Sequence, residues 1–140
     1  MKLLKSKRVI FGCELRGDHM TPYLTRYTLI ECKNWQLCLH VFHRSDWEDA
    51  LHDHPWNFVS LLLWRGYTEH TLTGKRRYYP GSVLVRPASH IHRVEIPAGK
   101  KAISLVWMGK RKREWGFVVK DKWGYLTWTS FLKYFIKNKC

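Results

Sequence analysis

The chain has 140 residues, a length that fits one compact domain. Apolar residues make up 45% of it, which is enough to build a core and excludes wholesale disorder. Lysine and arginine outnumber aspartate and glutamate by 25 to 11. The resulting net charge of +14 favours an anionic partner, either a small anionic molecule or nucleic acid.

Membrane and secretion signals are not expected in this sequence. The longest apolar run, 61–64, is far shorter than the roughly 18 residues that cross a membrane. Near the start, Lys5, Lys7 and Arg8 interrupt any apolar stretch of the signal-peptide type. The four cysteines show neither a CxxC pair nor zinc-finger spacing, which favours reduced thiols. We therefore expect a cytoplasmic protein with no membrane partner.

Short β-type runs follow one another, separated by glycine, proline and charged turns. The strands expected in chain order are 8–15, 23–32, 35–43, 58–64, 67–72, 82–86, 92–96, 102–108, 115–119 and 125–128. Turns are expected at 73–75, 79–81 and 97–100, and a hairpin loop at the basic segment 109–115. In the segment 130–139 apolar residues recur at helical spacing, which predicts a short C-terminal helix. This pattern predicts a mainly β sandwich or barrel in one domain, 1–140.

Two His-x-His pairs are the main chemical feature of the sequence. His52 and His54 lie in the sequence LHDHPW, and His90 and His92 lie in the sequence SHIHRV. In an extended strand, residues i and i+2 project from the same face, so the two imidazoles of a pair can converge. Neutral imidazole is a favoured ligand of zinc, iron, copper and nickel. Each pair begins an expected strand after a loop, which favours a shared metal site.

The first pair resembles the first sequence motif of the cupin family, G-x5-H-x-H-x3-4-E-x6-G. His52 and His54 supply its two histidines, and Gly66 stands at its final glycine. With four intervening residues, Val59 takes the glutamate position, and Asp46 replaces the opening glycine. The sequence also looks like that of small cupin-like proteins of unknown function that carry HDHPW.

The second pair resembles the second cupin motif, G-x5-P-x-G-x2-H-x3-N. Gly81 and Pro87 match its first two fixed positions, and His92 stands at the ligand histidine. Ser89 replaces the motif's second glycine, and Ile96 replaces its asparagine. The two motifs together span about residues 46–96.

This resemblance implies a double-stranded β-helix, or cupin jelly roll, with one divalent metal ion (iron, zinc, manganese or nickel). The implied ligands are His52, His54 and His92, and His90 is a candidate fourth ligand or base. Some cupins, including the thiol dioxygenases, bind iron through three histidines only, so the missing glutamate does not exclude a metal. Glu69 and Glu95 are candidate replacements for it. In a regular strand, however, Glu95 would point away from His92.

Four further residues are candidate ligand-binding residues near the motifs. Arg86 and Arg93 flank the second motif and could clamp a carboxylate or phosphate, because the guanidinium group matches these anions. Alternatively, the two arginines pair with carboxylates in structural salt bridges. Trp56 and Phe58 are candidates for lining a cavity, and the alternative is a place in the core. Asp53 is expected on the face opposite the histidines.

The sequence thus leads to two hypotheses about function. The first is a small metal-binding cupin, specifically a three-histidine Fe(II)-type dioxygenase, or with another metal an isomerase, acting on a small anionic substrate. The second is a non-catalytic module that binds an anionic ligand or nucleic acid through the basic segments 75–77 and 110–113. No catalytic residue is assigned. A homodimer formed through exposed strand edges is compatible with either hypothesis.

Overall fold

The computed structural model describes residues 2–10, 15–16, 19–20, 22–45, 50–119 and 124–127. All regular secondary structure in this part of the chain is β-strand. The C-terminal helix expected at 130–139 lies outside the described residues. Within the described ranges, no helix has the length and apolar character needed to cross a membrane.

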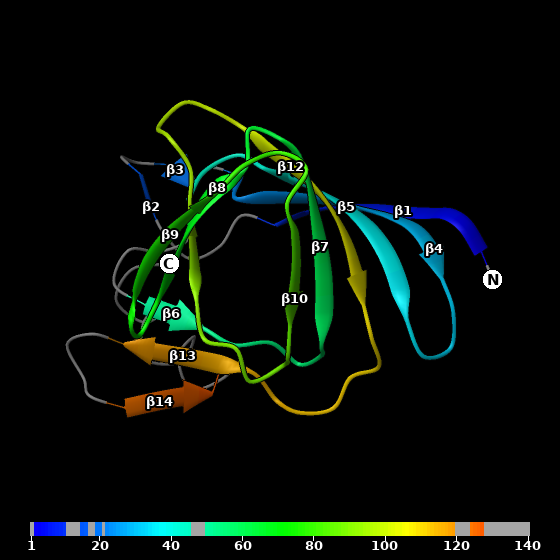
Figure 1. Ribbon diagram of the computed structural model, residues 1–140. Coiled ribbons are helices and arrows are strands. Elements are labelled where there is room, and N and C mark those ends of the chain that lie inside the picture. Colours follow the sequence, from blue (N-terminus) through cyan, green and yellow to red (C-terminus); the bar gives the residue numbers. More distant parts are fainter. Residues whose placement is uncertain are drawn as a thin grey trace.

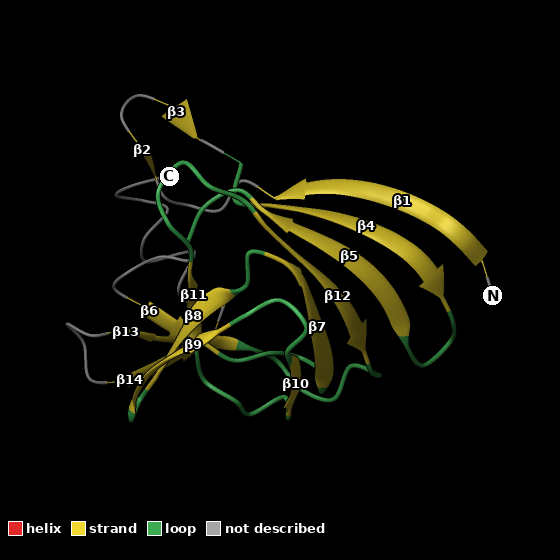
Figure 2. Cartoon of the chain, turned by 45° about the horizontal axis from the view of Figure 1, so that its top comes forward, coloured by secondary structure: helices red, strands yellow, loops and turns green. Residues whose placement is uncertain are grey.

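One layer of the molecule is an antiparallel sheet of six strands in the order β1-β4-β5-β12-β7-β10, which we call the large sheet. Figures 1 and 2 show it as a curved layer that runs from the N-terminal strand to β10. Its strands are β1 (Lys2–Ile10), β4 (Leu24–Glu31), β5 (Gln36–Phe42), β12 (Ala102–Met108), β7 (Phe58–Trp64) and β10 (Val83–Arg86).

The second layer consists of two three-stranded antiparallel sheets, in the orders β14-β13-β6 and β11-β8-β9. Their strands are β14 (Gly124–Thr127), β13 (Gly116–Val119), β6 (Ala50–His52), β11 (Arg93–Glu95), β8 (Tyr67–Thr71) and β9 (Gly74–Tyr78). An isolated bridge between His52 and His92 connects the two sheets into one layer. A separate short pair is formed by β2 (Leu15–Arg16) and β3 (His19–Met20).

The two layers enclose the core. In β7, β12 and β5, buried and less buried residues alternate, so every second side chain points inward. Phe42, Leu62 and Leu84 of the large sheet pack with Tyr67 and Val94 of the second layer. This arrangement confirms the expected mainly β jelly roll.

Some element boundaries differ from the sequence-based expectation. The strands at 58–64 and 102–108 are confirmed at both ends. The sequence missed β6 and β9, because three residues and a run of basic residues do not show a clear strand pattern. The turn expected at 73–75 instead falls at Leu72 and Thr73. The segment 109–115 is not a hairpin loop, because it connects β12 in one layer with β13 in the other.

Gly66, between β7 and β8, occupies a position that no other residue fits well. Its φ is +66°, and a Cβ atom there would clash with the backbone carbonyl oxygen of Tyr78. Gly99 has a similar φ of +70°, but nothing lies within 4 Å of the Cβ position. We expect Gly66→Ala to lower the free energy of unfolding by at least about 3 kcal/mol and Gly99→Ala by about 1 kcal/mol. Denaturant unfolding measures both, and equal losses would contradict the steric explanation.

Candidate metal centre

His52 and His92 form a cross-strand pair where the two sheets of the second layer meet. The amide of His52 donates to the carbonyl oxygen of His92 at 2.8 Å. The amide of His92 donates to the carbonyl oxygen of His52 at 2.9 Å. Residues directly opposite in antiparallel strands project to the same face. The two imidazole rings therefore lie side by side, with centroids 5.0 Å apart.

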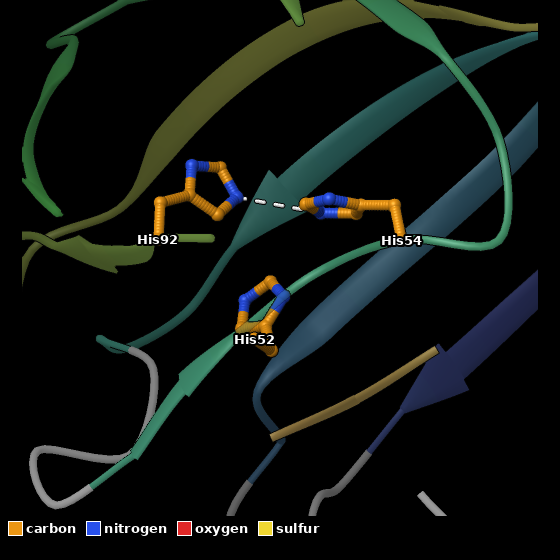
Figure 3. Close-up of side chains that lie close together, drawn as sticks. All are labelled: His52, His54 and His92. Carbon is orange, nitrogen blue, oxygen red and sulfur yellow. Dashed lines mark hydrogen bonds between the residues drawn. The ribbon is translucent and has the colours of Figure 1, made fainter. Parts of the chain in front are cut away.

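His54 brings the third ring from the loop after β6. Its amide donates to the carbonyl of Ala88 at 3.0 Å, which ties this loop to the segment before β11. Its ring lies 5.0 Å from that of His52 and 4.9 Å from that of His92. Figure 3 shows the three rings converging from two separate segments. Their candidate ligand atoms all lie within 4.8 Å of one another, so the three histidines could hold a metal ion.

The nitrogen positions fit a metal ion. Nε2 of His54 and Nε2 of His92 lie 3.3 Å apart. Two nitrogens bound to one tetrahedral ion at about 2.1 Å are about 3.4 Å apart, so this spacing suits a common ion. Nδ1 of His52 lies 3.4 Å from the carbonyl oxygen of Asp53. Each of the three histidines contributes one ring nitrogen to the candidate group.

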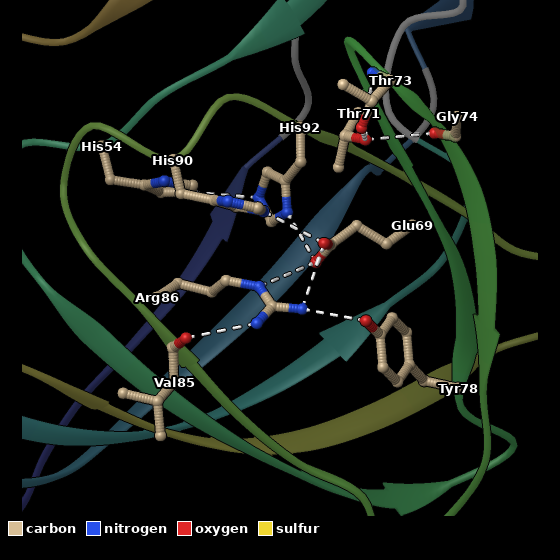
Figure 4. A network of polar contacts seen from close by, with 10 residues as sticks. All are labelled: His54, Glu69, Thr71, Thr73, Gly74, Tyr78, Val85, Arg86, His90 and His92. Atoms are coloured by element: carbon tan, nitrogen blue, oxygen red, sulfur yellow. Dashed lines mark hydrogen bonds and ion pairs between the residues drawn. The ribbon is translucent and has the colours of Figure 1, made fainter.

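A carboxylate on the neighbouring strand orients His92. Nδ1 of His92 donates to Glu69 at 3.1 Å, which places the lone pair of this imidazole on Nε2, facing His54. Nε2 of His90 also donates to Glu69, at 3.0 Å. Arg86 approaches both carboxylate oxygens, at 3.2 and 3.4 Å, and donates to the hydroxyl of Tyr78 at 3.1 Å. Figure 4 shows this network. Such carboxylate–histidine pairs are typical of metal-binding imidazoles.

The protonation states suit metal binding. Burial, followed by the charges of the neighbouring histidines, holds the pKa of His54 well below its usual 6.5, so its ring is neutral at pH 7. Burial alone would raise the pKa of Glu69, but hydrogen bonds from His92 and Arg86 and their charges lower it to about 2. Glu69 is therefore ionised and accepts from His92 over the whole physiological range.

Glu69, His90 and His92 form a second group whose geometry could hold a metal ion. In this group, however, the guanidinium of Arg86 already provides the positive charge beside the carboxylate. A second divalent ion would have to displace that arginine. The structure thus favours Glu69 as the partner of His92 and the three-histidine group as the ion site.

The sequence alignment placed the missing cupin glutamate one residue too late. Val59 points outward from the large sheet, where it lies opposite Val85 and Trp107. Phe58 points inward, and its ring centroid lies 4.4 Å from that of His54. The inward position beside His54 is therefore taken by Phe58, which the motif's shorter spacing of three residues would place at the glutamate.

The carboxylates next to the histidines face away from the centre, as alternation along a strand predicts. Oδ1 of Asp53 accepts from the amide of Gly116 at 2.7 Å, and Oδ2 pairs with Arg113 at 2.9 Å. Glu95 pairs with His70 and lies 3.4 Å from Arg93. Arg93 thus lies on the opposite face of β11 from His92, whereas Arg86 lies on the inner side beside Glu69.

A pocket of about 400 Å³ opens beside Glu69 and His90. Its lining includes three cationic residues, Lys75, Arg76 and Arg86, and one carboxylate residue, Glu69. Trp56 and Phe58 belong to a separate apolar cluster, with Cys38, Val106 and Met108, on the inner side of the large sheet. The pocket is positively charged, and the neighbouring cluster is apolar.

Two inner-facing polar residues, Arg26 and His40, were not recognised from the sequence. Nε of Arg26 donates to Nε2 of His40 at 3.1 Å, and burial lowers the pKa of both groups, that of His40 to about 3. No carboxylate contacts Arg26 among the described residues. The pattern that could have indicated them is strand alternation. Arg26 is two residues from the buried Leu24, and His40 is two residues from the buried Phe42, so both side chains point inward.

Comparisons with solved structures identify the class of fold. The chain has the fold of cupin-domain proteins. A cupin-2 domain protein from Rhodospirillum rubrum has a TM-score of 0.57 and 13% identity, covering 77% of this chain and 72% of that one. No protein-family model and no curated protein matches the sequence.

Two further structural neighbours have more specific names. A protein from Ralstonia eutropha JMP134, with a proposed mannose-6-phosphate isomerase activity, has a TM-score of 0.58 and 19% identity, covering 64% of this chain and 87% of that one. DMSP lyase from Ruegeria pomeroyi DSS-3 has a TM-score of 0.57 and 18% identity, covering 74% of this chain and 55% of that one. These different activities on one fold mean that the fold alone does not define a reaction.

Proposed function

We propose that the chain is a cupin-fold protein that binds one divalent metal ion through His52, His54 and His92. The observation that carries this proposal is the arrangement around His92. Its Nδ1 is engaged by the ionised Glu69, and its Nε2 faces the two other imidazoles. A neutral imidazole held in this way is a preferred ligand of borderline metals.

The ligand proposed for this ion is a small anionic molecule. Three neutral imidazoles leave the charge of a divalent ion uncompensated, and an anion in an open coordination position would balance it. The cationic residues around the adjacent pocket support the same ligand class. Arg86 is held by Glu69, so Arg76, which lies opposite Glu69 in the strand register, is the side chain proposed to contact the ligand.

The candidate reaction is dioxygenation of this anionic molecule with Fe(II) as the metal. Iron would supply Lewis-acid and oxygen-binding chemistry at the site. The chain's own part is to hold the anion and to exclude water. Phe58 covers one side of His54, and Glu69 keeps the proton of His92 on Nδ1. With zinc, manganese or nickel, an isomerase reaction is the alternative.

Metal analysis tests the proposal directly. Untagged protein reconstituted without oxygen, separately with Fe(II), Zn²⁺, Mn²⁺ and Ni²⁺, is expected to retain one equivalent of at least one metal after desalting. Elemental analysis gives the stoichiometry, and a chelator should remove the metal. Binding of nitric oxide to the iron form, followed by EPR spectroscopy, tests for an open coordination position. Substoichiometric content with all four metals would contradict the proposal.

The second candidate function is anion or nucleic-acid binding without a metal. Lys110, Arg111 and Lys112 are exposed in the connection between β12 and β13, which makes this surface available. This function requires binding that weakens steeply with salt and is unaffected by chelator. Chelator-sensitive binding of an anion would support the metal-centred function instead.

A further inference from the structure

A row of polar side chains crosses the inner side of the large sheet near its β1 edge. In the strand register, Arg8 of β1 lies opposite Arg26 of β4, and Arg26 lies opposite His40 of β5. Residues directly opposite in antiparallel strands project to the same face, and His40 is one of the buried, inward residues of β5. We call Arg8, Arg26 and His40 the inner basic row.

His40 holds the guanidinium group of Arg26 in place. Nε of Arg26 donates to Nε2 of His40 at 3.1 Å, so the proton of this imidazole is on Nδ1. Burial, followed by the charge of Arg26, lowers the pKa of His40 to about 3, and the ring is therefore neutral at pH 7. His40 thus engages one nitrogen of Arg26 without changing the charge of the row. The two terminal nitrogens of Arg26, Nη1 and Nη2, are left to bind another acceptor.

Two positive charges face each other in this row. Like charges directly opposite on adjacent strands destabilise the pair. Burial is the largest cause that lowers the pKa of Arg26, and the charge of Arg8 lowers it further. Within the part of the chain that the structure describes, no carboxylate contacts either arginine, and Glu31 lies at the other end of β4. An anion bound to both guanidinium groups would remove this repulsion.

The surroundings of Arg26 suit a bound anion that enters from solvent. The next inward residues along the two strands, Leu24 and Phe42, are buried and apolar. Such neighbours lower the local dielectric constant and strengthen the attraction between an anion and a guanidinium group. Arg26 is only partly buried, and Arg8 is exposed on the edge strand β1, so both can be reached. Figures 1 and 2 show β1 at this edge of the large sheet.

The charge of the row favours phosphate among the common anions. Two guanidinium groups carry two positive charges, and a phosphate monoester carries about 1.5 to 2 negative charges near pH 7. A carboxylate carries one negative charge and would leave the second arginine uncompensated. The planar guanidinium group also matches a pair of phosphate oxygens. The phosphates of a nucleic-acid backbone carry a single charge each, and a duplex cannot follow Arg26 to the inner side of the sheet.

We propose that Arg8 and Arg26 bind the phosphate group of a small phosphorylated molecule on the inner side of the large sheet, with His40 positioning Arg26. This site is separate from the pocket beside Glu69, whose cationic residues belong to β9 and β10. In the large sheet, β1 and β10 are the two opposite edge strands. Phosphate binding at the inner basic row requires no metal ion, so this proposal and that of the metal centre can fail separately.

An NMR titration of the metal-free protein with inorganic phosphate, at constant ionic strength, tests the site. The Nε–Hε signal of Arg26 reports binding at this row and not at the other basic segments. In wild type this signal is expected to shift with a Kd of about 1 mM or lower. Acetate is expected to bind at least about 10-fold more weakly, because it carries half the charge.

Two variants and a matched control locate the contacts. Arg8→Met changes an exposed side chain that the fold should tolerate, and it is expected to weaken phosphate binding at least about 10-fold through the loss of a charge-assisted contact. In Arg26→Met, phosphate is expected no longer to shift the ring signals of His40. The control is Lys7→Met, which removes the same charge from the next residue of β1, on the opposite face beside Tyr27. It should change the affinity by less than about twofold. Circular dichroism verifies that each variant is folded.

Three results would overturn the proposal. The first is an Nε–Hε signal of Arg26 that phosphate does not shift. The second is a folded Arg8→Met protein that binds phosphate as tightly as wild type, or one that is weakened no more than Lys7→Met. The third is acetate binding as tight as phosphate binding, which would assign the row to a carboxylate.

Discussion

Replacing His92 with alanine is expected to lower the affinity for a divalent ion by at least about a thousandfold. His92 is 3% exposed and connects the two parts of the site, since Nδ1 donates to Glu69 and Nε2 faces His54. Without its ring, the remaining His52 and His54 form a two-ligand site that cannot hold an ion tightly. The variant also leaves Glu69 without one of its donors, so its folding must be measured separately.

Competition with a fluorescent chelator, combined with elemental analysis, measures this loss. The matched control is His70→Ala, which removes an imidazole from the outer side of β8, where it pairs with Glu95. His70→Ala is expected to keep the full metal stoichiometry. If both variants lose metal equally, or if His92→Ala retains wild-type affinity while remaining folded, the ion is not bound by the three-histidine group.

The variant His90→Ala distinguishes between the two groups of candidate metal ligands. The ring of His90 contacts Glu69 and lies 5.1 Å from that of His92. If the ion is bound by His52, His54 and His92, we expect this variant to lose at most about 10- to 100-fold in affinity, as residues that support a ligand do. A loss equal to that of His92→Ala would instead show that His90 is a ligand.

The placement of His52 and His54 on one face could be predicted because it depends on local rules, whereas the convergence of His92 with them was implied by the resemblance to the cupin motifs. A period of two places residues i and i+2 of an extended segment on one face, and Pro55 keeps His54 extended. The inward or outward direction of Asp53 and Glu95 follows from the same alternation. The strands 58–64 and 102–108 were predictable because they combine β-branched and large apolar residues over a full strand length.

The partner of His92 could not be identified in the same way. Glu69 reaches it because β8 pairs with β11 in the register that sets Val94 opposite Glu69. Such a register depends on the long connection between the strands and on packing against the large sheet, neither of which a local pattern encodes. The placement of Val59, instead of Phe58, at the motif's glutamate position has a similar cause. A difference of one residue in a loop reverses which side chain points inward, and the family motif allows both spacings.

The backbone pairing of the fold also positions the candidate metal site. The only direct link between the two three-stranded sheets, within the described residues, is the bridge of His52 with His92. The pair that positions two candidate ligands is therefore the same pair that makes the second layer continuous. Changes to these side chains leave the backbone hydrogen bonds intact, so their effects on the metal and on folding can be separated.

Glu69→Gln is expected to lower the free energy of unfolding of the metal-free protein by about 2 to 4 kcal/mol. The side chain of Glu69 is 4% exposed, and it accepts from Arg86, His90 and His92. Removing its charge leaves the largely buried guanidinium of Arg86 without a compensating carboxylate. Metal affinity is expected to fall by about 10- to 100-fold, because His92 loses the partner that fixes its tautomer.

The matched control is Glu95→Gln, a carboxylate on the outer side of the neighbouring strand. Its side chain is 48% exposed and pairs with His70 and Arg93. Solvent reaches the carboxylate of Glu95, although the side chain of Arg93 beside it is only 9% exposed. The loss of stability should therefore be smaller than that of Glu69→Gln, and metal affinity should not change. Similar losses in both variants would show that Glu69 has no special role.

The stabilisation by Glu69 is expected to depend on pH in a defined direction. Its pKa in the folded protein is about 2, lower than the ordinary value of 4.5, although burial alone would raise it. Its ionised form therefore stabilises the fold at every pH above about 4.5, and this stabilisation is lost as the pH falls from 4.5 toward 2. Denaturant unfolding without metal should show the difference between wild type and Glu69→Gln narrowing by about 1 to 2 kcal/mol between pH 5 and pH 3. Taking the difference cancels the protonation of the histidines that do not contact residue 69, which excludes His90 and His92. A difference that stays constant or widens over this range would mean that Glu69 is not held ionised by His92 and Arg86.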